Sequence, residues 1–265
     1  MSYTRKEQQE KFYKIATGKN GKKYVLRETV ESVYHYTDGN SKTGKAGNYN
    51  LPIEYTCNHD CECYKEGLCY ACGGCYQFPD NQALYSENLN FFNMSTDNEF
   101  ISVVSWSIAK DKLTLWRWFT IGDIPNTRFL ACMVAIAKEN PQVKFWSYTK
   151  KYSIVNAWID KNGDLPKNLV IIFSHWLNRD GTYYSMENPH NLPTSEFIPI
   201  GKEELTKTVT HVCPCSDPTV KSTCATCDHP CYTLKSGESM ALLEHSTKAT
   251  KARDKAIKEA KAQLK

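Results

Sequence analysis

The sequence predicts an α/β fold, either a partial (β/α) barrel or an open parallel sheet, with cysteine-rich metal-binding loops before the core and near the C-terminus. Between residues 114 and 176, β-branched and aromatic runs alternate with helical patterns, which implies parallel strands joined by crossover helices. All but one of the twelve cysteines fall outside that stretch, in two groups over residues 57–75 and 213–231.

Each element follows from its own pattern. The run TLWRWFTI is β-branched and aromatic, which is typical of a buried strand. Asn126 carries the side chain of a helix N-cap, and Asn140-Pro141 stops the helix that follows. The predicted strands are residues 114–121, 143–149 and 169–176, and the predicted helices are residues 81–94, 98–110, 126–140 and 153–159.

We predict one α/β domain over residues 39–245, between an N-terminal extension (1–38) and a basic C-terminal tail (246–265). The tail is predicted to be a solvated, Ala-rich helix, and its alternative interpretation is a contact with nucleic acid. No apolar run reaches the length of a membrane span, and the N-terminal stretch lacks the apolar core of a signal peptide. We therefore expect a reducing cytoplasm and no membrane partner.

The first cysteine set places six thiols within nineteen residues. Disulfides rarely persist in a reducing compartment, so a dense group of this kind indicates metal. Thiolates in a short loop can surround a tetrahedral zinc or the corners of a [4Fe–4S] cluster, and the C-x2-C-x2-C end of the set resembles ferredoxin loops. The set consists of Cys57, Cys61, Cys63, Cys69, Cys72 and Cys75.

The second cysteine set supplies five thiols, enough for all four ligands of one metal site. His211 and His229 are nearby alternatives that can replace a cysteine on zinc. Its two interpretations are an auxiliary [4Fe–4S] cluster and a structural zinc site. The remaining cysteine, Cys132, is predicted to be an inert core residue. The set consists of Cys213, Cys215, Cys224, Cys227 and Cys231.

Polar residues follow three of the predicted strands, where ligands gather in parallel sheets. Asp123, which comes after Gly122, can accept hydrogen bonds from a ligand, or can merely start the next helix. Lys150 and His175 stand at equivalent strand ends, where they can meet an anion or transfer protons. We expect the first cysteine set on the same rim, and we predict that the six tryptophans belong to the core.

A series of motifs runs from Gly39 to His245, beginning with GNSKTG, NLPIEYTC and CYACGGCYQF. RWFTIGD, FWSYTK and the late CATCDHPCY complete the series. In this order the motifs resemble the phage gene-product-88 family. The resemblance implies a protein of bacteriophages and mobile elements, acting in the cytoplasm of the host cell, with no established activity.

A cysteine loop followed by strand–helix units is also similar, more loosely, to radical-SAM-type iron–sulfur proteins. That resemblance implies a [4Fe–4S] cluster on three cysteines, S-adenosylmethionine on its open iron, and Gly122-Asp123 beside the ligand's amine. The loop of those proteins is C-x3-C-x2-C, whereas here Cys63 and Cys69 follow Cys57-x3-Cys61. Two arrangements are then open. Either Cys57, Cys61 and Cys69 ligate the cluster as a triad with wider spacing, or four or more cysteines ligate it and leave no iron open.

Two functions are consistent with these features. The first is a [4Fe–4S] cluster-binding protein with radical-SAM-like or other redox chemistry at the strand rim, where a small molecule binds beside the cluster. The alternative is a zinc-stabilised phage or plasmid interaction protein whose basic ends contact nucleic acid. The sequence leaves both an enzyme and a binding protein open.

Overall fold

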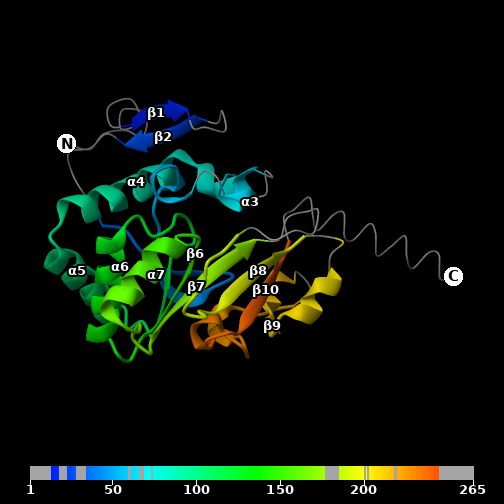
Figure 1. The fold of residues 1–265 in the computed structure, drawn as a ribbon. Coiled ribbons are helices and arrows are strands. Elements are labelled where there is room, and N and C mark those ends of the chain that lie inside the picture. The colour runs from blue at the N-terminus through cyan, green and yellow to red at the C-terminus, as the bar shows by residue number, and fades with distance from the viewer. Residues whose placement is uncertain are drawn as a thin grey trace.

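The computed structural model describes a sheet with helices on one face and a cysteine-rich segment on the other (Figure 1). The described residues are 13–17, 23–27, 34–58, 61–65, 69–72, 74–176, 185–199, 201, 203–217 and 220–244. The predicted helix in the tail, residues 246–265, lies outside them.

The main sheet has eight strands in the order β3-β4-β5-β6-β7-β8-β10-β9. Only the β3–β4 pair is antiparallel, and all the other pairs are parallel. The order is linear, with β3 and β9 at its two edges, so the described strands form an open sheet rather than a closed barrel. The strands are β3 (Thr37–Asn40), β4 (Gly44–Tyr49), β5 (Leu115–Trp118), β6 (Lys144–Thr149), β7 (Leu169–Trp176), β8 (Thr194–Ile198), β9 (His211–Val212) and β10 (Ser239–Leu243).

Four long helices cover one face of this sheet (Figure 1). They form the crossovers from β4 to β7, and crossovers between neighbouring parallel strands share one hand, which places them on the same side. The largest apolar cluster fills the space between, with Trp116 and Trp118 of β5 packed against Phe129 and other aromatic residues. The helices are α4 (Pro79–Met94), α5 (Asp97–Lys110), α6 (Thr127–Glu139) and α7 (Tyr152–Asn162).

The opposite face of the sheet is covered by the C-terminal segment. Ala46, Trp146 and Ile172 project from the strands and pack against Leu234 and Met240 in a separate apolar cluster, together with cysteines of the second set. This segment consists mainly of short 3₁₀ turns: η4 (Pro214–Ser216), η5 (Cys224–Thr226) and η6 (Cys231–Thr233). A further turn, η3 (Glu203–Thr208), instead packs Leu205 against Ile198 and Ala241, which point to the other face.

A separate hairpin precedes the sheet. Its strands β1 (Tyr13–Thr17) and β2 (Lys23–Arg27) are antiparallel, and β2 lies along α4 (Figure 1). None of the helices in the described ranges has the length and apolar character needed to cross a bilayer.

Most predicted core residues are buried as expected. Cys132 is 1% exposed, and five of the six tryptophans are buried. The prediction is wrong for Trp106, which is 60% exposed on α5 with the Lys110 ammonium 5.0 Å from its ring. Trp106 occupies a helix position that faces solvent, and residue type alone does not show which face of a helix is buried.

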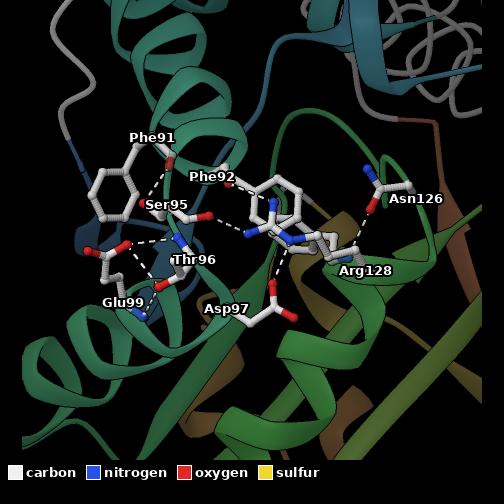
Figure 2. A network of polar contacts seen from close by, with 9 residues as sticks. Phe91, Phe92, Ser95, Thr96, Asp97, Glu99, Asn126 and Arg128 are labelled. Carbon is white, nitrogen blue, oxygen red and sulfur yellow. Dashed lines mark hydrogen bonds and ion pairs between the residues drawn. The ribbon is translucent and has the colours of Figure 1, made fainter.

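Arg128 of α6 connects that helix to the turn between α4 and α5 through hydrogen bonds (Figure 2). Arg128 donates to the carbonyl oxygens of Phe92 and Ser95 at the end of α4, and to the carboxylate of Asp97 in the first turn of α5. Thr96 caps α5 in a reciprocal arrangement, in which its backbone N–H donates to Glu99 and its hydroxyl accepts from the Glu99 N–H.

Candidate metal centres

The first cysteine set lies at the C-terminal ends of the parallel strands, as expected. After β4, the helix α2 (Ile53–Thr56) ends at Cys57, whose backbone N–H donates to the Ile53 carbonyl at 3.1 Å. Asn58 then reaches the end of β6, where its amide donates to the Lys150 carbonyl at 3.1 Å. The remaining cysteines occupy α3 (Glu62–Lys65), η1 (Tyr70–Cys72), η2 (Gly74–Gln77) and the chain next to them.

Four thiols of the first set form a continuous chain of contacts. The Sγ atoms of Cys61 and Cys63 are 3.2 Å apart, Cys63 also hydrogen-bonds Cys69, and Cys69 hydrogen-bonds Cys72. Hydrogen bonds from Cys61 and then from Cys69 lower the pKa of Cys63, whereas the same contacts raise the pKa values of those two partners. This geometry therefore favours one thiolate, that of Cys63, which accepts hydrogen bonds from the neighbouring thiols.

The other two cysteines of the set differ in their surroundings. Burial raises the pKa of Cys57, and the nearby charges of Asp123 and Cys63 raise it further. Cys75 is solvent-exposed, beside Tyr76 and Tyr85. The structure therefore gathers five thiols and leaves Cys75 at the surface.

Asp123 connects three segments of the rim. Its carboxylate accepts hydrogen bonds from the Thr149 hydroxyl at 2.6 Å, from the Lys150 backbone N–H at 3.0 Å and from the N–H of Ile124 at 2.7 Å. Its own N–H donates to the hydroxyl of Thr56, next to Cys57. Burial raises the pKa of Asp123, and the three hydrogen bonds oppose that shift.

Gly122 allows the loop after β5 to lie against the chain after β4. It has φ +89°, and a Cβ atom there would stand 2.5 Å from the Leu51 carbonyl oxygen. The Leu51 N–H donates to Ile121 in the same contact, at 3.0 Å. Gly122 and Asp123 thus hold the first cysteine set against the sheet, whether or not a ligand also reaches Asp123.

Lys150 faces the first cysteine set, and His175 does not share its face of the sheet. The Lys150 ammonium donates to the Ser174 hydroxyl at 3.0 Å. Burial alone lowers the pKa of Lys150, but Cys63, Cys61 and Asp123 raise it further, so the net shift is upward. His175 alternates with Ser174 along β7 and pairs in register with Glu196, on the other side of the sheet.

The second cysteine set lies over the middle of the sheet. The Tyr148 hydroxyl of β6 donates to the Cys231 sulfur at 2.7 Å. The rings of His211 and His229 stack at 4.7 Å. Burial raises the pKa of Cys231 to about 12 and that of Cys224 to about 11. A narrow pocket is lined by Cys213, Cys215, Cys224, Cys227, Cys231 and His229.

Two cations that the sequence interpretation missed adjoin this set. The Arg117 guanidinium of β5 lies 5.2 Å from the centroid of the Tyr148 ring. Negative charge on Cys224 or Cys231 would raise the pKa of Arg117. Its Nε is buried with no hydrogen-bond partner within the described ranges. Lys42 lies beside Cys215 and Cys213. The available signal was Arg117 itself, a charged residue between two tryptophans of a buried strand.

The thiols are not arranged around a metal position. None of the twelve cysteines, all of which lie in described parts of the chain, forms a disulfide bond. Within the described ranges, no group of three or more His, Cys, Asp or Glu side chains already has the geometry of a metal site. Both sets therefore supply suitable donors, and in the first set the Cys61 and Cys63 thiols contact each other.

Comparisons with known proteins identify a family. No curated protein and no solved structure matches the chain. The family described as Gene product 88 matches residues 16–194, which is more than half of the chain. That range contains the first cysteine set and the Gly122-Asp123 loop, and it ends before the second cysteine set. The chain belongs to the Gene product 88 family.

Proposed function

We propose that this protein binds iron–sulfur clusters. The first cysteine set holds a [4Fe–4S] cluster at the strand rim, and the second holds an auxiliary cluster on the sheet face. One observation carries the proposal: each set of thiols gathers against a cation that the sheet supplies. Lys150 faces the first set, and Arg117 faces the second.

The charges explain why these cations are there. A metal centre ligated by four thiolates is an anion, and a buried cation beside it is favourable. Without such an anion, the unpartnered Nε of Arg117 is costly, because a buried guanidinium needs hydrogen bonds and a counter-charge. Disulfides carry no charge and would leave Arg117 uncompensated.

The first set favours iron over zinc. Its last part, Cys69-x2-Cys72-x2-Cys75, has ferredoxin-like spacing, whereas zinc sites more often use two separated C-x2-C pairs. When bound, a cluster at this rim supplies electrons or an iron able to take a ligand. Asp123 positions the cysteine loop against β6, and Lys150 provides positive charge beside it. This arrangement supports redox chemistry and leaves the identity of the reaction open.

Anaerobic purification with iron, sulfide and zinc analysis tests the proposal. We expect about four irons and four sulfides per cluster, with broad visible absorbance. Cys69→Ser should remove the first cluster and Cys224→Ser the second, whereas Cys132→Ala, in the core, should retain both. A colourless protein containing zinc alone, prepared from anaerobic cells, would rule out the iron proposal.

A second measurement distinguishes an open cluster from a closed one. Adding S-adenosylmethionine to the reduced protein should change the EPR signal if one iron of the first cluster is open, as the radical-SAM resemblance implies. An unchanged signal together with full iron content would instead assign a closed cluster that transfers electrons.

Zinc is the second candidate for the second set, because a histidine lies among its thiols. His229 lines the same pocket as the five cysteines, and zinc accepts mixed cysteine and histidine ligands. The protein would then be a zinc-stabilised interaction protein, with nucleic acid as the partner of its basic ends. If the His229→Ala variant loses zinc while its iron content stays constant, the second set is assigned as a zinc site.

A further inference from the structure

The sheet face opposite the helices carries a group of polar side chains where β6 and β7 end and β8 begins. Lys150 follows β6, Ser174 and Trp176 belong to the end of β7, and Ser195 belongs to β8. Ser174 pairs in register with Ser195, so both project from the same face, and Trp176 follows two residues later on that face. The Lys150 ammonium joins them through Ser174 and lies 5.3 Å from the Trp176 ring.

Two buried polar atoms in this group have no hydrogen-bond partner among the described residues. Ser195 is 1% exposed and Trp176 is 6% exposed. Neither the Ser195 hydroxyl nor the Trp176 indole N–H makes a hydrogen bond within the described part of the chain. Leaving a buried donor unsatisfied is unfavourable, so these two atoms on one face of the sheet need an explanation.

The group is rich in donors and carries positive charge. Lys150 has three N–H donors, of which Ser174 takes one, and the indole can only donate. The nearby Asp123 carboxylate accepts its hydrogen bonds from a hydroxyl and two backbone N–H groups, and the hydrogen bond that the Lys150 ammonium donates goes to Ser174. A cation surrounded by unused donors is the complement of an anion.

An aromatic wall adjoins these donors. Trp176 stacks on Phe197, with the ring centroids 4.1 Å apart and the planes inclined by 4°. Phe197 pairs in register with Trp176 and shares its face of the sheet. A ligand whose anionic end meets Lys150 would therefore place an apolar part against this pair.

We infer that this face binds a small organic anion, a carboxylate or a phosphate ester, through Lys150, Ser174, Ser195 and the Trp176 indole. The site deepens the proposed function and rests on it in one respect: because Lys150 also faces the first cysteine set, the bound anion lies beside that centre. The rim of parallel strands is where α/β folds bind their ligands.

Calorimetric titration of the metal-loaded full chain tests the site. The probes are inorganic phosphate, phenyl phosphate and benzoate, with benzyl alcohol as the uncharged control. We expect at least one anion to bind in the millimolar range or tighter, phenyl phosphate more tightly than inorganic phosphate, and benzyl alcohol not to bind. The phosphate and benzoate arms decide between the two anion types. If no anion binds, the inference is wrong.

Variants separate recognition from structure. Ser195→Ala removes an unsatisfied hydroxyl, so it should leave the melting temperature of the ligand-free protein unchanged or higher while weakening anion binding about tenfold. Trp176→Phe keeps an aromatic ring, removes the N–H and should also weaken binding. Ser107→Ala, a buried serine of α5, is the matched control and should bind like the wild type.

The outcomes distinguish this inference from the proposed function. Ser195→Ala should retain the iron and sulfide of the wild type, because Ser195 contributes no thiol. Unchanged anion affinity in both Ser195→Ala and Trp176→Phe would overturn the site while leaving the clusters intact. If the purified protein contains no iron but still binds anions, the proposal of iron–sulfur clusters is wrong and the anion site stands.

Discussion

A single buried carboxylate, that of Asp123, organises the strand rim. It accepts three hydrogen bonds from β6 and its own loop, and its backbone reaches the helix that ends at Cys57. Asp123→Asn replaces one acceptor oxygen with an NH₂ group, leaving at least one buried donor without its partner. We expect a loss of about 1–3 kcal/mol in unfolding free energy, measured by denaturant titration. Asp164→Asn, on the exposed loop after α7, should have no effect.

Arg117 should have opposite effects in metal-free and metal-loaded protein. Replacing it with methionine removes a buried guanidinium whose Nε has no partner, so the metal-free chain should become more stable by about 1 kcal/mol. In loaded protein the same change removes the counter-charge of the second centre and should destabilise it. Melting temperatures before and after metal removal test this. Destabilisation in both states would indicate that Arg117 only fills space.

At the scale of the helix, the cap of α5 should make stability depend on pH. The Thr96 backbone N–H, followed by its hydroxyl, lowers the pKa of Glu99 below the ordinary value of 4.5. A lowered carboxylate pKa contributes stability above the unfolded value, and this contribution is lost as pH falls through the folded value. Glu99→Gln should therefore lower the denaturation midpoint at about pH 7, and its effect should shrink as the pH falls below 4.5 and through the folded pKa. Glu204→Gln, on the exposed η3, should show no such pattern.

The contact between α4 and α6 should depend more on carbonyl groups than on charge. Arg128 donates to two carbonyls at the end of α4, whereas its ion pair with Asp97 is largely exposed. Arg128→Ala should therefore lower the unfolding free energy by about 1–3 kcal/mol, and Asp97→Ala by less than about 1 kcal/mol. Equal losses in thermal denaturation would show that the ion pair dominates.

The periodic elements were predictable, and the irregular ones were not. The strand β7 spans the predicted residues because its apolar run is continuous. The strand β5 ends early, since Phe119 takes φ +57° and donates to Tyr49. The sequence of β4, GKAGNY, is a poor strand former. It pairs with β5 because Gly47 leaves room for the Trp116 ring, a tertiary effect that local preference does not contain.

The candidate site was predictable as two groups of cysteines but not as an arrangement. Spacing shows that thiols are dense, whereas it does not show that the second set covers a sheet face. Side chains alternate along a strand, so the sequence shows only that Arg117 points away from the face that its two neighbours share. Which of the two faces that is depends on the side of β5 that the helices cover. The Ser195 hydroxyl has no hydrogen-bond partner among the described residues, a property that depends on the tertiary packing of β8 and not on local sequence.

For the whole molecule, the second cysteine set acts as the cover of an apolar face. Trp146 and Ile172 would be exposed if that segment loosened. Metal removal should therefore increase binding of a hydrophobic dye such as ANS while strand content, followed by far-UV circular dichroism, is largely retained. Cys224→Ser should show the same dye binding before metal removal, and Cys132→Ala should not. Dye binding unaffected by metal removal would mean that the cover does not depend on metal.

The position of β10 has a consequence for synthesis on the ribosome. This strand lies between β8 and β9, although it follows both in the chain. Until its residues leave the exit tunnel, β8 presents an open edge, and β9 lacks the only neighbour that the described strands give it. A chain that ends before Ser239 would therefore keep an unpaired, aggregation-prone edge at β8, because the described sheet is complete only once β10 has been added.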